Sequence, residues 1–364
     1  MQNVRKDATL HNGFEDNLEP VTALNLQECK TVDDLLRRMK NSSFEARKIG
    51  EAADILEEMF EKKECYTVLT LSGALTMAKM SLIFTELIER GWVDAVVSTG
   101  ALIAHGFIAS SGMTHFKYNW DMDDKKLYEL GYDRVYDTLE LEKNFMDASM
   151  LIDNIFGKEE YDGKSLGSWE ICEIIGKHLH DASAESSLLK SAYEKKVPVY
   201  IPALNDSELG LDLISLRYST RRSDRPKVKI THDAFADVLD FAKRFSKQET
   251  AGIFTIGGGV PRNWAQQIGP FLELKYDISN PDRKFPRYHY GVRICPDPVT
   301  WGGLSGCTYS EGTSWGKFDS DGKFSEILVE ATAVLPFLVK ALMERFDAKE
   351  KRPGNAKNGN NGKK

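Results

Sequence analysis

The 364-residue chain has no apolar run approaching the roughly 20 residues that a membrane-spanning helix needs. Residues 1–19 are polar and lack the apolar segment of a secretory signal. Lys and Arg number 48 against 55 Asp and Glu, so the net charge of -7 is not that of a general nucleic-acid binder. The sequence therefore predicts a cytoplasmic protein that binds neither membranes nor nucleic acid.

Cysteine is scarce, and no Cys-x-x-Cys pair occurs among the five cysteines. Their odd number and spacing argue against a disulfide framework and against a zinc cage. The seven histidines are scattered without H-E-x-x-H or a carboxylate-rich metal spacing, so no metal is expected. The P-loop motif is missing, which excludes the nucleotide hydrolases that carry it.

Hydrophobic residues make up 41% of the chain, enough for a sizeable core. Residues 31–62 follow helical spacing and predict an N-terminal segment of two helices. Beyond them, short apolar runs predict buried strands, and longer periodic stretches predict helices. The predicted strands are 66–71, 93–97, 197–201, 251–256 and 327–329, and the predicted helices include 74–90, 168–195, 233–245 and 331–346.

This alternation predicts an α/β fold: a Rossmann-like, doubly wound, mostly parallel sheet with an N-terminal helical segment. Residues 112–165, rich in charges and aromatics, are interpreted as helix and connecting loop. We expect three regions: an arm and helical segment over 1–62, a catalytic domain over 63–348, and a disordered basic tail over 349–364.

Ligands of such sheets bind at the carboxyl ends of the strands, where four loops are expected: 72–73, 98–101, 203–210 and 257–259. The triple glycine 257–259 could bring backbone amides to a phosphate, or it could be a tight turn, since it is not G-x-G-x-x-G. Asp206 could bind ribose hydroxyls or hydrogen-bond within its own turn. His105 follows the Ser-Thr-Gly loop and has either a ligand contact or a structural role.

Residues 300–317 combine five glycines with two tryptophans, too polar for a core element and too aromatic for a linker. Only Gly316 separates Trp315 from Lys317. A lysine beside an aromatic wall loses hydration and becomes a nucleophile toward carbonyls or imines, and Glu311 could hold a cationic substrate nearby. The alternative is a surface lysine whose stem lies on a tryptophan.

The run Thr313-Ser314-Trp315-Gly316-Lys317 resembles the active-site lysine motif of the deoxyhypusine synthase family. Residues 93–100, 202–210 and 256–260 resemble that family in the same order, so the similarity covers most of the chain. It implies an NAD-dependent enzyme that oxidises spermidine, releases 1,3-diaminopropane and carries the 4-aminobutyl group as an imine on Lys317 to an acceptor amine. It also implies a homotetramer with sites between subunits.

The resemblance further implies two groups of site residues beside the catalytic Lys317. For NAD they are Thr99, Gly100, Asp206, Glu330 and Ala331. For the polyamine substrate they are Gly258, Asn263, Ser305, Gly306, Glu311, Trp315 and His105, with Trp315 along the alkyl chain and Glu311 at a terminal ammonium.

Several positions depart from the family pattern. Ala104 and His105 replace two consecutive glutamates, Asn263 replaces a histidine, Leu211 an aspartate, and Glu330 an aspartate. Residues 205–213 and 257–267 resemble the bacterial deoxyhypusine-synthase-like branch. Bacteria generally lack the hypusine-containing translation factor, so the resemblance favours a small acceptor such as putrescine, giving homospermidine.

Three alternatives stay open. The acceptor could be a protein lysine, although the missing glutamate pair weakens the case for holding two cations. A plain NAD-dependent amine dehydrogenase would release NADH and would not need Lys317. A non-catalytic NAD-binding scaffold would have no reason to keep Trp315, Lys317 and Glu311 together.

Overall fold

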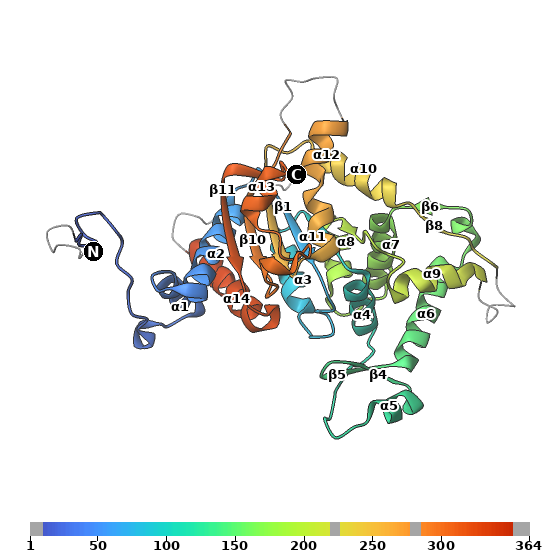
Figure 1. Cartoon of the computed structure of the whole chain (residues 1–364). Helices are drawn as coiled ribbons and strands as arrows, with labels where there is room; N and C mark the ends of the chain where they lie inside the picture. Colours follow the sequence, from blue (N-terminus) through green and yellow to red (C-terminus); the bar gives the residue numbers. More distant parts are fainter. Residues whose placement is uncertain (1–9, 219–225, 277–284, 352–364) are drawn as a thin grey trace, which may run out of the picture.

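The computed structural model describes residues 10–218, 226–276 and 285–351. Its centre is a six-stranded parallel sheet in the order β11-β10-β9-β1-β2-β7 (Figure 1). The strands are β1 (Cys65–Leu71), β2 (Ala95–Ser98), β7 (Val199–Tyr200), β9 (Thr250–Ile256), β10 (Tyr288–Ile294) and β11 (Phe318–Ile327). From the middle of the sheet, β1, β2 and β7 follow one another to one edge, and β9, β10 and β11 follow one another to the other edge. This is the strand order of dinucleotide-binding sheets. The predicted Rossmann-like, doubly wound sheet is confirmed.

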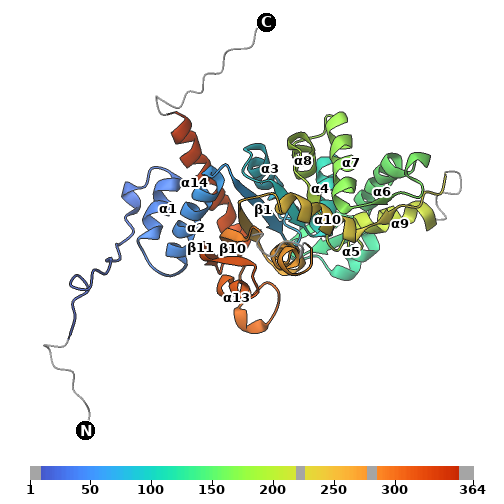
Figure 2. The ribbon, with the colours of Figure 1, turned by 90° about the horizontal axis from the view of Figure 1, so that it is seen from above.

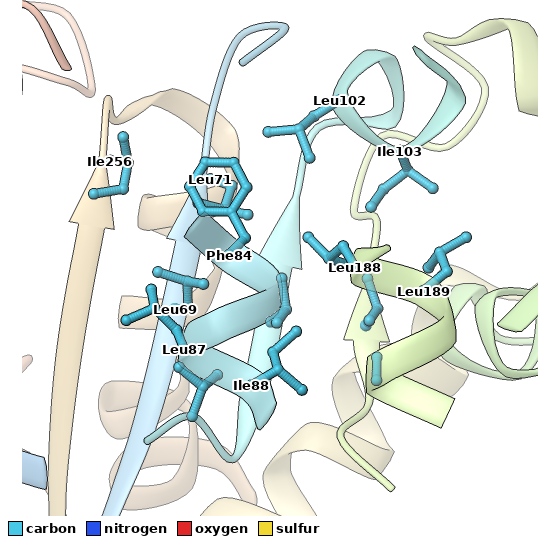
Figure 3. Packing of buried hydrophobic residues seen from close by; sticks show 14 of the residues in the cluster. Leu69, Leu71, Phe84, Leu87, Ile88, Leu102, Ile103, Leu188, Leu189 and Ile256 are labelled. Atoms are coloured by element: carbon cyan, nitrogen blue, oxygen red, sulfur yellow. The ribbon is translucent and has the colours of Figure 1, made fainter. Parts of the chain in front are cut away.

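Strand β1 is buried along its whole length, so its residues face helices on both sides of the sheet. Leu69 and Leu71 pack on the face covered by α3 (Ser81–Glu89), where they meet Phe84 and Leu87 (Figure 3). Val68, which points to the opposite face, packs with residues of α10 (Ala234–Phe245), α11 (Gly259–Gln266) and α12 (Ile268–Phe271). Alternation along one strand thus builds a core on each face.

The two predicted N-terminal helices are α1 (Val32–Lys40) and α2 (Phe44–Glu61), and the closing helix is α14 (Ala331–Glu350). Thr31 caps α1 by accepting a hydrogen bond from the N–H of Asp34, in a capping box. The buried Arg345 of α14 pairs with Asp33, Asp54 and Glu57 on α1 and α2. The three helices therefore lie together beside β10 and β11 (Figures 1 and 2). The domain boundary at residue 62 stays a prediction.

Residues 112–165 differ from the expected helix and loop. They contain a three-stranded antiparallel sheet of β3 (Phe116–Lys117), β5 (Thr138–Leu141) and β4 (Tyr132–Val135). They also contain α5 (Asp124–Leu130), α6 (Glu142–Phe156) and η3 (Glu159–Tyr161). The strands have four residues or fewer. Strands β3 and β4 are mostly exposed, and β5 buries only Leu139 and Glu140, so they carry no periodic apolar signal. We call residues 112–141 the antiparallel lobe, which projects from the main body in Figure 1.

Other predicted bounds were wrong. The strand predicted at 327–329 is the end of β11 and the link to α14, and the helix predicted from residue 74 begins at Ser81, because residues 74–80 form turns. Of the predicted tail, residues 349–350 belong to α14, and 352–364 lie outside the described residues. The remaining elements are η2 (Leu26–Glu28), α4 (Gly100–Ser110), β6 (Ser165–Leu166), α7 (Ser168–Asp181), α8 (Leu188–Lys195), α9 (Glu208–Tyr218), β8 (Thr231–His232), η5 (Leu272–Tyr276), η6 (Val299–Trp301) and α13 (Tyr309–Ser314). Within the described ranges, no helix is both long and apolar enough to cross a membrane.

Candidate functional site

The strand order reverses between β1 and β9, and the loops that follow these two strands meet there. The Gly258 N–H donates to Ser72 Oγ at 3.2 Å, and the Ser72 N–H donates to the Ile256 carbonyl at 3.1 Å. A cavity of about 410 Å³ opens at this point. We call it the switch-point cavity; its walls include Ser72, Thr99, Gly100, Ala101, Asp206 and Gly259. Open α/β sheets bind ligands at such a reversal.

Two helix N-termini point their first-turn amides toward this cavity. Thr99 is the N-cap of α4 and Gly258 that of α11, and neither contributes a capping side-chain hydrogen bond. The free first-turn amides, which on α11 are only those of Gly259 and Val260 because Pro261 has no N–H, can therefore meet a ligand. The helix dipole favours a negative group there, such as a pyrophosphate. A Cβ at Gly100 would overlap the side chain of Ser207, so only glycine lets the start of α4 lie this close to the loop that contains Ser207. These features fit a dinucleotide, and they bring Thr99, Gly100 and Asp206 together.

Glu330 is the N-cap of α14, and Ala331 is its first residue. Glu330 lines a second cavity of about 950 Å³. Ala74 lines both this cavity and the switch-point cavity. The Glu330 carboxylate accepts hydrogen bonds from Thr332 Oγ1 at 2.5 Å and from the Ala333 N–H at 3.2 Å. Burial raises the pKa of Glu330, but these hydrogen bonds outweigh it and lower the pKa overall. The residues that the family resemblance assigns to NAD therefore lie at two adjoining cavities, with Glu330 lining the second and Ala331 next to it in the chain.

Lys317, directly before β11, is 8% exposed. Its Nζ donates to Asn263 Oδ1 of α11 at 3.2 Å and lies 5.8 Å from the centre of the Trp315 ring. Burial lowers the pKa of Lys317, and the Arg262 guanidinium lowers it further, against the opposing influence of Cys307 and Glu311. A lower pKa makes the neutral, nucleophilic amine more available. Trp315 itself is 64% exposed, so the aromatic wall is open on one side.

The glycine-rich loop 302–307 lies against the start of α11. A Cβ on Gly258 would stand 2.5 Å from the Cα of Ser305, so the two segments touch at backbone distance. Two buried arginines that the sequence analysis missed hold the loop by its carbonyl oxygens. Arg293 Nη1 donates to Ser305 and, at 3.1 Å, to Cys307, while Arg262 Nη1 donates to Leu304 at 3.4 Å. The carbonyl groups that these arginines bind lie in an irregular loop that is distant in the sequence, so no residue spacing could single out the two arginines.

Gly306 belongs to this loop, and Glu311 lies in α13, between the loop and Lys317. The Glu311 N–H donates to Thr308 Oγ1 at 3.0 Å in the first turn of α13. Burial raises the pKa of the Cys307 thiol, and the neighbouring Glu311 raises it as well. The Gly306 N–H closes a turn onto the Gly303 carbonyl at 3.0 Å. The structure thus brings Glu311, Trp315 and Asn263 around Lys317, with Ser305 and Gly306 next to them.

His105 lies on α4, apart from the residues that touch Lys317. Its Nδ1 is 3.2 Å from Oε2 of Glu140, a buried carboxylate of β5 that the sequence analysis did not single out. Two groups of three potential metal ligands occur in the described part of the chain, although sequence spacing indicated none. They are His105, His115 and Glu140, and His289, Asp319 and Asp321.

Comparison with known proteins agrees with the family resemblance. The sequence model of the deoxyhypusine synthase family matches residues 34–342. "Probable deoxyhypusine synthase 2" of Methanosarcina mazei is 33% identical over 336 residues, covering 92% of each chain. "Deoxyhypusine synthase-like protein" of Chlorobaculum parvum is 32% identical over 327 residues, covering 88% of each chain. These near-equal identities leave the bacterial branch a prediction.

A crystal structure from Entamoeba histolytica, described as a "putative deoxyhypusine synthase", shares the fold. It superimposes with a TM-score of 0.56 at 16% identity, covering 89% of this chain and 97% of the other. The family match over most of the chain, and relatives more than 30% identical over almost its whole length, establish that this protein belongs to the deoxyhypusine synthase family.

Proposed function

We propose that this protein is an NAD-dependent aminobutyltransferase. It takes the 4-aminobutyl group of spermidine onto Lys317 as an imine, releases 1,3-diaminopropane, and passes the group to a small amine such as putrescine. Bound NAD supplies the oxidation of the donor and the final reduction of the product. Thr99, Gly100 and Asp206 would hold it in the switch-point cavity, with Glu330 and Ala331 at the adjoining cavity.

The setting of Lys317 carries this proposal. The amine is nearly buried, faces the neutral amide oxygen of Asn263, and lies beside the Trp315 ring. A carrier must form an exchangeable bond to carbon, and among side chains only an amine forms an imine that a second amine can displace. Asn263 belongs to the same helix whose first residues line the switch-point cavity, so α11 links the carrier to the cofactor residues.

The small acceptor is the finer part of the proposal. It is supported by the similarity of residues 205–213 and 257–267 to the bacterial deoxyhypusine-synthase-like branch. It is also supported by Ala104 and His105, which replace two glutamates of the family pattern. The second candidate, a protein lysine, is favoured by the archaeal relatives named as deoxyhypusine synthases. A homotetramer and a cytoplasmic location stay predictions.

The deciding experiment is mass spectrometry of reactions that contain the protein, NAD and spermidine, with and without putrescine. We expect diaminopropane in both reactions and homospermidine only where putrescine is present. Lys317→Ala should abolish transfer and leave NAD binding intact. Lys323→Ala is the matched control and should keep activity, because it removes an exposed lysine of β11, the strand that follows Lys317, and this lysine pairs with Glu58.

Other outcomes separate the alternatives. Diaminopropane without any new small polyamine would point to a protein acceptor. Free NADH together with full activity of Lys317→Ala would establish the amine dehydrogenase and refute the imine carrier. If the wild type produces neither diaminopropane nor NADH, spermidine is not its substrate.

A further inference from the structure

A buried carboxylate joins the antiparallel lobe to α4. Glu140 of β5 is fully buried, and four groups donate hydrogen bonds to it. His105 Nδ1 at 3.2 Å and His115 Nε2 at 2.5 Å meet Oε2, while Asn144 Nδ2 at 2.7 Å and the Leu141 N–H at 3.1 Å meet Oε1. All four lone-pair positions of the carboxylate are thereby used.

This arrangement assigns the protons on both histidines. Burial raises the pKa of Glu140, but the hydrogen bonds from His105, His115 and Asn144 outweigh it and lower the pKa to about 2. An ionised carboxylate only accepts, so His105 carries its proton on Nδ1 and His115 on Nε2. Lys79 Nζ hydrogen-bonds Nδ1 of His115, where an ammonium can only donate, which agrees with that tautomer. In the neutral ring, His105 Nε2 is left with a lone pair.

The helix places this ring one turn from a wall residue of the switch-point cavity, which His105 itself does not line. His105 follows Ala101, a wall residue of that cavity, by four residues on α4, so both lie on one helix face. Helical side chains lean toward the N-terminus, which brings the imidazole over the turn that Ala101 occupies. Phe145 packs against the ring at 5.9 Å between centres, and 13% of the side chain stays exposed.

We propose that His105 accepts the proton of the amine substrate during its oxidation, and that Glu140 is the positioning residue that fixes the tautomer of His105. The proposal rests on the proposed function. The secondary ammonium of the donor gives one N–H proton to His105 Nε2. The freed nitrogen lone pair then forms the C=N bond, while the neighbouring C–H bond breaks and its hydrogen leaves with both electrons to NAD⁺. One proton on His105 and one hydride on the cofactor balance the step.

The residues around Lys317 leave this task open. Asn263 has no basic nitrogen to take up a proton, and Lys317 must keep its own lone pair to attack the new C=N carbon. Histidine is the side chain whose ordinary titration range suits a general base near neutral pH. His105 is also one of the positions at which this chain departs from the family pattern.

Titratable groups on the elements that pack around α4 must be separated from His105 in a pH profile. They are Glu140 and His115, with Lys79 behind His115, and Asp212 on α9, which packs against α4. Burial raises the pKa of Asp212 to about 6, against a hydrogen bond with Ser149. Asp212 could therefore titrate in the same pH range, and it needs its own variant.

The test measures kcat and KM for diaminopropane release from pH 5 to 9 in four variants. We expect His105→Gln to lower kcat by about 10²–10⁴-fold with little change in KM, to remove the acid limb of the profile, and to regain activity with added imidazole. Glu140→Gln should move the acid limb to lower pH, because an imidazolium loses its neighbouring carboxylate. His115→Gln and Asp212→Asn, the controls, should keep the wild-type acid limb.

A second readout does not depend on turnover. Nitrogen NMR of histidine-labelled protein should show an Nδ1–H tautomer that disappears in His105→Gln and loses its preference in Glu140→Gln. Wild-type kcat and acid limb in His105→Gln, or a change in KM alone, would overturn the proposal. Stoichiometric metal in the purified protein would also overturn it, since His105, His115 and Glu140 would then be ligands. If the wild type releases no diaminopropane, the proposed function has failed, and the NMR result alone reports on the Glu140 arrangement.

Discussion

Replacing Asn263 by aspartate tests whether Lys317 must lose its proton to act. The substitution keeps the shape of the side chain and places a carboxylate oxygen where the amide oxygen now stands, 3.2 Å from Lys317 Nζ. A carboxylate stabilises the ammonium far more than a neutral amide does. We therefore expect Asn263→Asp to hold Lys317 in its protonated, unreactive form at neutral pH.

The size of the effect follows from this distance. At 3.2 Å, Coulomb's law gives about 5 kcal/mol with an effective dielectric constant of about 20, and about 1.3 kcal/mol with that of water. Lys317 is 8% exposed, which places the real value between these limits. Since about 1.4 kcal/mol corresponds to one pH unit, the rise of activity with pH should move upward by about 1 to 4 pH units.

The assay follows the imine on Lys317 in single turnovers with NAD and spermidine, trapped with borohydride and weighed by mass spectrometry at each pH. Asn263→Ala, the control, removes the hydrogen-bond acceptor without adding charge and should show no upward shift. Equal pH profiles for the aspartate variant and the wild type would refute the reasoning, because the rate of imine formation would then not depend on deprotonation of Lys317.

Two further predictions concern the frame of the site. Arg345→Met should lower the free energy of unfolding by about 1–3 kcal/mol in denaturant titrations, because it removes the one buried cation shared by three carboxylates. Asp33, Asp54 and Glu57 would keep only their more exposed partners Arg37, Lys40 and Lys349, and a loss below about 0.5 kcal/mol would mean that these partners and solvent screen the cluster. Gly258→Ala should reduce the transfer rate at least about tenfold, since its Cβ would meet the backbone of Ser305, whereas Gly303→Ala, with open space around the added Cβ, should not. Equal rates in these two variants would contradict the tight packing of the loop on α11.

The sequence was most informative where one element determines its own structure. Strands β1 and β9 are nearly continuous apolar runs because helices bury both of their faces, so they could be predicted without knowledge of their partners. Strand β10 was missed because Tyr288–Ile294 carries histidine, glycine and an arginine. The buried Arg293 is stabilised by the carbonyls of Ser305 and Cys307 and by Glu326 on β11, which are contacts between separate segments. Contacts between separate segments override the local strand propensity, and a single sequence does not show which segments will be in contact.

The same difference separates the two parts of the candidate site. Trp315 and Lys317 stand two residues apart, so a short motif was enough to single them out. Asn263 lies 54 residues from Lys317 and was named only because the family pattern has a distinctive residue there. Glu140 had neither signal, because an acidic residue in a charged segment looks like an ordinary solvated side chain until the fold buries it.

Burial of Glu140 also explains why the departure at His105 is not an isolated change. The family pattern has a glutamate at that position, and here it would put a second carboxylate against a fully buried one. Two carboxylates at that distance cannot both stay ionised, so one would take up a proton and give up its role as a charged acceptor. A histidine removes the conflict, because its Nδ1–H donates to Glu140 and the carboxylate keeps its charge. His105 and Glu140 are therefore one unit, and whatever amine this protein accepts must suit an imidazole where the family pattern has an acid.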